Sequence, residues 1–260
     1  MATLLLTVLS QTPFGDHVLV APRHVLVAGY GPWASHLDNP SAETAAALNN
    51  TCYQSVCFTG WNLTVSHAGA SRVADALYRG ELKRYDAIVT LGLESSAKGL
   101  MIELAGTNVR AETDGKLPID PRRPLSALLP PTIDTARLEI GKALAPVAAA
   151  VEAARSRRVQ NEAAVASSVE DLDEEELIGS LWSRDAGTFY CNEALYRTSD
   201  AIRRLKATRR DDASLLLPFA FVHLPEPSLA PVGTVVAPAI AKLAVALLAA
   251  DALAAVVQSD

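Results

Sequence analysis

The chain of 260 residues has few of the features that would identify a specialised class of protein at once. Its three cysteines are an odd number, so a framework of disulfides does not hold the fold together. Positive charge is scarce, because 23 Lys and Arg stand against 29 Asp and Glu and no dense basic block occurs. This balance argues against nucleic acid or an anionic membrane as a partner.

No apolar stretch is long and uninterrupted enough to predict a membrane span. The stretch from Pro238 to Val257 carries Lys242 and Asp251, which predicts a packed helix. The first ten residues, MATLLLTVLS, lack a basic start and a clear small-residue cleavage site. They predict an edge strand rather than a signal peptide, and we expect a cytoplasmic protein.

Cys52 and Cys57 are five residues apart and could pair in a favourable loop geometry. In a cytoplasmic chain, however, disulfides are rare. The preferred interpretation is therefore two small apolar residues beside the start of a strand.

Half of the residues are apolar, and apolar runs that end at glycine alternate with segments of helical periodicity. Strands are expected at 24–31, 62–69, 86–93, 178–187 and 217–225, and helices at 41–50, 71–85, 134–156 and 238–257. This alternation predicts one α/β domain over residues 1–260, a three-layer α/β/α sandwich around a mainly parallel, twisted sheet. Ser41 is the expected N-cap of the first helix, and Pro146 is expected to bend the third.

Three segments do not fit the alternation. Residues 1–23 form an N-terminal extension, and the proline-rich residues 109–133 predict a loop excursion. A polar insertion is expected at about 156–178, with the acidic run EDLDEEE inside it. Because this run lacks EF-hand spacing and a nearby histidine, a solvated helix is favoured over a cation site.

Cys191 lies where a glycine turn is followed by an amphipathic helix, in SRDAGTFYCNEALYRTSDAIRRLK. Gly187 relaxes the turn, and apolar residues recur at Leu195, Ile202 and Leu205. The thiol is therefore expected in or near the first helical turn. Unpaired N–H groups and the positive end of the helix dipole favour a thiolate there, and they could also bind a developing oxyanion.

His223 ends the apolar run LLLPFAFV and is followed by LPEP, so the strand stops directly after it. In a parallel sheet, ligands bind beyond the carboxyl ends of the strands, where the Cys191 helix also begins. A cysteine nucleophile with a histidine proton carrier requires a third group that orients the imidazole. Spacing alone leaves Glu94, Glu103 and Asp185 open for that role.

The segment SRDAGTFYCNEALY resembles the nucleophile motif of pyroglutamyl peptidase I, the pyrrolidone-carboxylate peptidases of the cysteine peptidase class. Three further segments are similar to family motifs in the same order: GYGPWASHLDNPS (29–41), IELAGTN (102–108) and FVHLP (221–225). The resemblance covers most of the chain from about His24 onward. The family usually has phenylalanines at the positions of Tyr30 and Trp33.

The resemblance implies a cysteine peptidase that removes an N-terminal pyroglutamyl (5-oxoproline) residue from peptides through a thioester acyl-enzyme. Cys191 would be the nucleophile, His223 the general base and then acid, and Glu103 the residue that orients it. The reaction would need no metal or organic cofactor. The lactam ring would be bound by Tyr30, Trp33, Phe189, Tyr190 and Leu93.

Two other classes of protein lack their motifs in this sequence. VAGYGPW lacks the third glycine of a dinucleotide-binding turn, and no G-x-S-x-G elbow of a serine hydrolase occurs. Two alternatives remain open. A non-catalytic relative could bind a small lactam or a peptide N-terminus, or a cysteine hydrolase could act on another cyclic amide. The apolar stretch SLLLPFAF and the last helix would permit a homo-oligomer.

Overall fold

The computed structural model describes residues 21–33, 37–112, 115–133, 141–162, 182–183, 186–208 and 217–257. The predicted N-terminal edge strand, the acidic run at 170–176 and Asp185 lie outside these residues.

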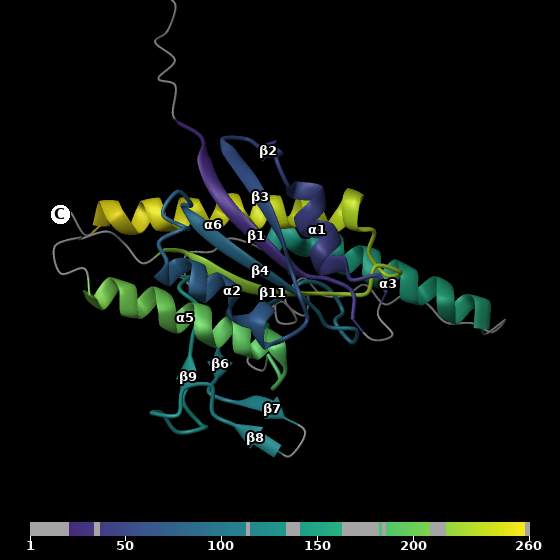
Figure 1. Ribbon diagram of the computed structural model, residues 1–260. Coiled ribbons are helices and arrows are strands. Elements are labelled where there is room, and N and C mark those ends of the chain that lie inside the picture. Colours follow the sequence, from purple (N-terminus) through teal and green to yellow (C-terminus); the bar gives the residue numbers. More distant parts are fainter. Residues whose placement is uncertain are drawn as a thin grey trace, which may run out of the picture.

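A seven-stranded sheet runs through the molecule in the order β10-β5-β11-β4-β1-β3-β2 (Figure 1). Parallel pairs join β1 to β3 and β4, β4 to β11, and β5 to β10, whereas β2 and β5 pair antiparallel with β3 and β11. The central strands are continuous apolar runs because both faces of the sheet are covered. The strands are β1 (Arg23–Tyr30), β2 (Cys52–Tyr53), β3 (Val56–Leu63), β4 (Ala87–Leu93), β5 (Met101–Glu103), β10 (Trp182–Ser183) and β11 (Phe219–Leu224).

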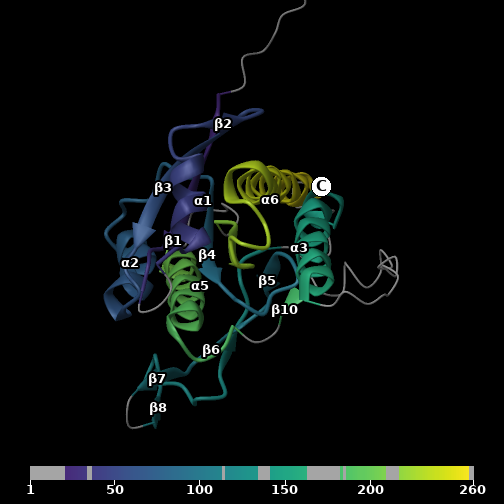
Figure 2. The same ribbon diagram turned by 90° about the vertical axis from the view of Figure 1, so that its right-hand side faces the viewer.

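Helices cover both faces of this sheet, which confirms the three-layer α/β/α sandwich (Figure 2). On one face α1, α3 and α6 pack against alternate strand residues such as Val25, Val27 and Val89. On the other face α2 and α5 pack against Leu26, Ala28 and their neighbours. The helices are α1 (Pro40–Leu48), α2 (His67–Tyr78), α3 (Gly141–Glu162), α5 (Tyr190–Thr208) and α6 (Ala237–Val257), with one π-helical turn, η1 (Val232–Val236), before α6.

Several predicted boundaries are wrong. The helix expected at 71–85 ends at Tyr78, and the strand expected at 178–187 is described as strand only at Trp182–Ser183. In two further cases a polar side chain caps a helix. Asn39, not Ser41, is the N-cap of α1, because its side chain accepts a hydrogen bond of 3.0 Å from the backbone N–H of Ser41. The second strand covers 56–63 rather than 62–69. Ser66 is the N-cap of α2, so the helix already begins at His67.

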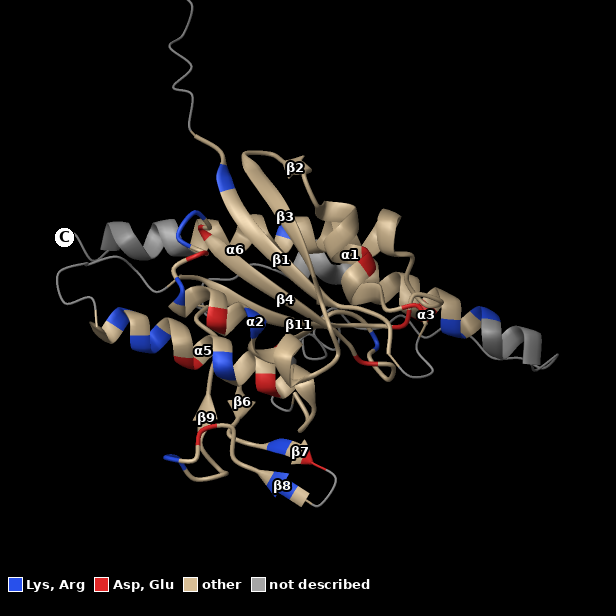
Figure 3. Ribbon diagram, viewed as in Figure 1, with Lys and Arg blue, Asp and Glu red and all other residues tan. Residues whose placement is uncertain are grey.

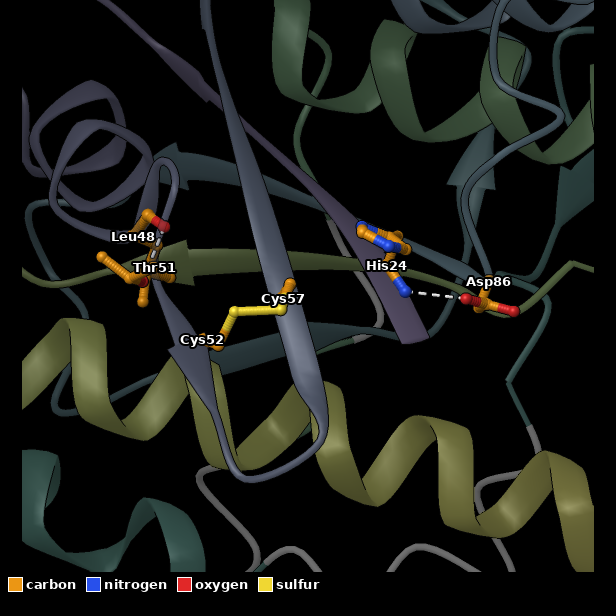
Figure 4. The surroundings of a disulfide bond; sticks show 6 residues. All are labelled: His24, Leu48, Thr51, Cys52, Cys57 and Asp86. Atoms are coloured by element: carbon orange, nitrogen blue, oxygen red, sulfur yellow. Dashed lines mark hydrogen bonds between the residues drawn. A yellow bond between two sulfur atoms is a disulfide. The ribbon is translucent and has the colours of Figure 1, made fainter. Parts of the chain in front are cut away.

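A disulfide joins Cys52 and Cys57, so the preferred interpretation of these residues as unpaired is wrong (Figure 4). Gln54 adopts a left-handed conformation (φ 55°) that closes the hairpin between β2 and β3. The two cysteines therefore lie directly opposite each other, with Cα atoms 4.0 Å apart. Because disulfides are rare in reducing compartments, this bond does not favour the cytoplasmic location, which stays a prediction.

The proline-rich excursion lies outside the main sheet, as expected, but it is not only a loop. It contains two small antiparallel ladders that project from the body of the molecule (Figures 1 and 2). The strand β6 (Gly106–Thr107) pairs with β9 (Leu128–Leu129), and β7 (Arg110–Glu112) pairs with β8 (Gly115–Leu117). The amide of Ala111 donates to the carbonyl of Thr188 at 2.7 Å, which fixes the excursion beside the turn before α5.

The two long alanine-rich helices pack as the sequence predicts. Pro146 lies within α3, which continues to Glu162 and so includes the first part of the expected polar insertion. Among the described residues, 232–250 is the one stretch long and apolar enough to cross a membrane, and half of it is buried inside the molecule. By length and composition this stretch is therefore not too interrupted to span, contrary to the expectation from the sequence, and its buried residues belong to the core on one face of the sheet.

Candidate active site

Cys191 is the second residue of α5, in the first helical turn as predicted. Gly187 adopts a φ of +75°, a left-handed conformation that favours glycine in the turn before the helix. All three cysteines are described, and Cys191 is the one that remains a free, partly exposed thiol. The first N–H groups of a helix have no intrahelical partner, so this position can stabilise negative charge on sulfur or on a bound oxyanion.

His223 and Glu103 form a short, buried hydrogen bond at the same edge of the sheet. The His223 Nδ1 and Glu103 Oε1 atoms are 2.6 Å apart. Glu103 is fully buried and His223 is 5% exposed. The two side chains meet because β5 and β11 are neighbouring strands, with His223 in register with Met101.

Glu94, the other described carboxylate that spacing had left open, bonds elsewhere. Glu94 accepts hydrogen bonds from the amide and hydroxyl of Ser96, at 2.9 and 2.7 Å. Asp185 lies outside the described residues. Among the carboxylates that the structure describes, Glu103 is therefore the one that bonds to the His223 ring.

The charges around His223 favour its protonated form. Burial alone lowers the pKa of His223, but the charge of Cys191, hydrogen bonds with Cys191 and Glu103, and the charge of Glu103 together raise it to about 10. An imidazolium next to sulfur is the environment that activates a cysteine nucleophile.

Gly92 lies directly beside both the sulfur and the imidazole, and sequence reasoning missed it. It is the penultimate residue of β4 and is in register with His223 on β11. A Cβ atom at Gly92 would lie 2.8 Å from Cys191 Sγ, 2.9 Å from His223 Cδ2 and 3.0 Å from Phe221 Cζ. Only glycine leaves that space free, and the signal in the sequence was an apolar strand that ends at a glycine.

Three of the five predicted ring-binding residues form one aromatic cluster, and a hydrogen bond joins Tyr30 to it. The Trp33 and Phe189 ring centroids are 5.5 Å apart, and those of Phe189 and Tyr190 are 4.2 Å apart. Trp33 and Phe189 are 36% and 43% exposed, so they offer apolar faces to a ligand. Tyr30 is buried, and its hydroxyl donates to the carbonyl of Tyr190 at 2.9 Å.

The fifth residue, Leu93, directly follows Gly92 at the end of β4. It is half-buried and in register with Leu224. Successive residues of a strand point to opposite faces of the sheet, so Leu93 does not share the face on which Gly92 approaches Cys191 and His223. The structure therefore does not direct this predicted ring-binding side chain at the Cys191–His223 pair.

Asn192, which sequence reasoning also missed, fixes the nucleophile helix to the excursion. Its amide donates to the carbonyls of Thr107 and Val109 at 3.0 and 2.6 Å, and its oxygen accepts from the amide of Thr107 at 2.7 Å. The side chain is fully buried. Satisfied buried amides of this kind hold backbone segments in one arrangement.

A cavity of about 390 Å³ lies between α2, α5 and residues 119–122, away from the Cys191 sulfur. Its lining includes Asp120, Arg122, Asp200 and Arg204, which pair with one another. Within the described residues, no group of three or more His, Cys, Asp or Glu side chains could hold a metal ion.

No model of a known protein family matches this chain, and no curated protein matches it. Solved structures do. Pyroglutamyl peptidase I from Bacillus amyloliquefaciens is 16% identical with a TM-score of 0.54, covering 89% of this chain and 95% of its own. The pyrrolidone carboxyl peptidase of Thermococcus litoralis is 18% identical with a TM-score of 0.51, covering 92% and 96%. A mutant pyrrolidone carboxyl peptidase from Pyrococcus furiosus is also 18% identical, with a TM-score of 0.52 and coverage of 88% and 97%. The chain therefore has the α/β fold of these peptidases.

Proposed function

We propose that this protein is a cysteine peptidase that removes an N-terminal pyroglutamyl residue from peptides. The observation that carries the proposal is the alignment of Cys191, His223 and Glu103 at one edge of the sheet. The likeness in fold to pyroglutamyl peptidase I structures supports the same reaction class.

In the proposed reaction, the Cys191 sulfur attacks the carbonyl carbon of the pyroglutamyl residue and forms a tetrahedral intermediate. N–H groups at the start of α5 stabilise its oxyanion. His223, which holds a proton, donates it to the leaving amine as the C–N bond breaks, and a thioester remains on Cys191. His223 then removes a proton from water, which attacks the thioester carbonyl. The C–S bond breaks, free pyroglutamate leaves, and the Cys191 thiolate and the protonated His223 of the starting state are restored.

Glu103 keeps the imidazole in the required orientation. Its Oε1 atom bonds Nδ1, which leaves Nε2 free to exchange protons with sulfur, amine and water. Because the carboxylate is fully buried, its charge also stabilises the imidazolium.

The proposed ring site consists of the aromatic cluster. A flat, neutral lactam binds well against exposed aromatic faces, and Trp33 and Phe189 offer such faces. Tyr190 packs against Phe189, and the hydroxyl of the buried Tyr30 donates a hydrogen bond to the Tyr190 carbonyl. The expected partners are pyroglutamylated peptides, and association into a homo-oligomer stays part of the proposal.

A hydrolase of another cyclic amide is the second candidate. Trp33 and Tyr30 stand where the resembling family usually has phenylalanine, and the indole of Trp33 is larger and partly exposed. These two side chains would reshape the wall of the ring site while leaving Cys191 and His223 unchanged.

The test is release of the fluorophore from pyroglutamyl-7-amino-4-methylcoumarin by the wild type and by Cys191→Ser. The proposal expects turnover by the wild type and none by the variant. No turnover, with fast iodoacetamide labelling of Cys191 at neutral pH, would favour the second candidate. No turnover with slow labelling would point to a non-catalytic binding protein.

A further inference from the structure

A second histidine–carboxylate pair lies beside the nucleophile. Glu193 is two residues after Cys191 in the first turn of α5 and is fully buried. His67 is the first residue of α2, and its Nδ1 atom is 2.6 Å from Glu193 Oε2. Neither residue has a role in the reaction described above.

The pair belongs to a larger group of charges, which we call the Glu193 cluster. Arg197 contacts Glu193 Oε1 through Nε and through its terminal nitrogen, both at 2.7 Å. On the other side, His67 Nε2 is 3.3 Å from Glu112 Oε1, which Arg110 Nε contacts at 3.0 Å. The cluster joins α2, α5 and β7, where charges of both signs alternate (Figure 3).

The Glu193 cluster touches the residues around the sulfur. The His67 ring packs edge-on against Tyr190, the residue before Cys191, with centroids 5.0 Å apart. The pKa of Tyr30 is well above its ordinary value because of burial first, and then because of the charges of Cys191 and Glu193. The field of Glu193 therefore reaches the groups that surround Cys191.

Titratable groups from several elements lie around the sulfur and its neighbours. Tyr30 on β1 and His223 on β11 interact with Cys191 itself. The groups that contact or act on these residues or their neighbours are His67 on α2, Glu94 after β4, Glu103 on β5, and Tyr190 and Glu193 on α5. Of these, Glu193 is a buried carboxylate within the same helical turn as the sulfur. A buried carboxylate close to a thiolate destabilises it unless other groups compensate its charge.

We propose that His67 and Glu193 are positioning residues that adjust how readily Cys191 forms its thiolate. In this arrangement His67 and Arg197 compensate the Glu193 charge, so that the carboxylate can hold α2 against α5 without opposing the nucleophile. The inference rests on the proposed function only in taking Cys191 as the nucleophile.

The test measures the rate of Cys191 alkylation by iodoacetamide as a function of pH, followed by intact mass. Cys191 is the one free thiol among the three cysteines, so the adduct reports on it alone. His67→Phe keeps a ring against Tyr190 but removes the N–H donor to Glu193. The pH of half-maximal labelling should then rise by about 0.5 to 1 unit.

Glu193→Gln keeps the side-chain shape but removes the charge, so its midpoint should fall by a similar amount. His67→Asn restores a donor near the position of Nδ1 and should return most of the shift. Midpoints that do not move, or that move in the same direction in His67→Phe and Glu193→Gln, would overturn the proposal. If His67→Phe does not fold, Glu193→Gln decides alone: an unchanged or raised midpoint overturns it.

The labelling assay contains no pyroglutamyl substrate. Opposite shifts in a wild type that does not cleave the coumarin substrate would therefore reject the proposed substrate and still support the role of the cluster. Normal turnover of the coumarin substrate with unchanged labelling midpoints would support the proposed substrate and reject the role of the Glu193 cluster.

Discussion

Gly92→Ala tests the geometry of the proposed nucleophile and base most sharply. The added methyl group would lie 2.8 Å from Cys191 Sγ and 2.9 Å from His223 Cδ2. Ordinary contacts between such atoms are about 3.5 to 4.0 Å, so each atom must move by roughly 0.7 Å or more. Both are ends of rotatable side chains, and turning away from the methyl group separates them from each other.

Displacements near 1 Å in a catalytic pair cost about 10²-fold in rate, so kcat/KM should fall by at least about that factor. The fold should survive, because overpacking costs about 1–3 kcal/mol, or a few degrees in Tm. The assay is hydrolysis of pyroglutamyl-7-amino-4-methylcoumarin, with Tm measured on the same samples. Gly233→Ala is the matched control, since its added Cβ would meet nothing within 4 Å. A Gly92→Ala enzyme within threefold of wild type would refute the reasoning.

Three further predictions concern the surroundings of the site. The kcat/KM profile should fall as pH rises through about 10, because His223 then loses the proton that it gives to the leaving amine. Glu103→Gln removes one cause of the raised pKa of His223, so the fall in kcat/KM should move to lower pH. Asn192→Ala leaves buried carbonyls of the excursion unpaired, so the free energy of unfolding should fall by about 2–4 kcal/mol in denaturant titrations, with lower kcat/KM. Replacing Cys52 and Cys57 together by serine should lower the free energy of unfolding by about 2 kcal/mol or less. The change should leave kcat/KM unchanged, because β2 is the edge strand farthest from β5, and a large loss of activity would contradict this.

The fold was predictable where one physical signal dominated. The strands β1, β4 and β11 are continuous apolar runs, as is typical of buried strands, and they alternate with helical segments. The placement of Cys191 in the first turn of α5 followed from Gly187 and the periodic apolar residues after it. Boundaries at α1 and β3 were wrong because Asn39 and Ser66 cap helices, and nothing in the local pattern distinguishes them from neighbouring polar residues.

The site was less predictable, because its contacts cross long sequence distances. Spacing could not select among the three carboxylates, whereas the structure brings Glu103 to His223 over 120 residues. Gly92 and Asn192 matter only through contacts with residues distant in sequence. Gly92 leaves room for the Cys191 and His223 side chains, and Asn192 joins α5 to the backbone of the excursion. The pairing of Cys52 with Cys57 depends on the hairpin turn at Gln54, which composition does not reveal.

The most direct test of the proposed peptidase is to trap its thioester. The wild type would be mixed with an activated pyroglutamyl ester, quenched in acid within milliseconds to seconds, digested and analysed by mass spectrometry, with Cys191→Ala as control. We predict one pyroglutamyl group on the peptide that contains Cys191, formed in a burst and then lost to water. Turnover of the ester without an adduct at Cys191, or equal turnover by Cys191→Ala, would contradict the account.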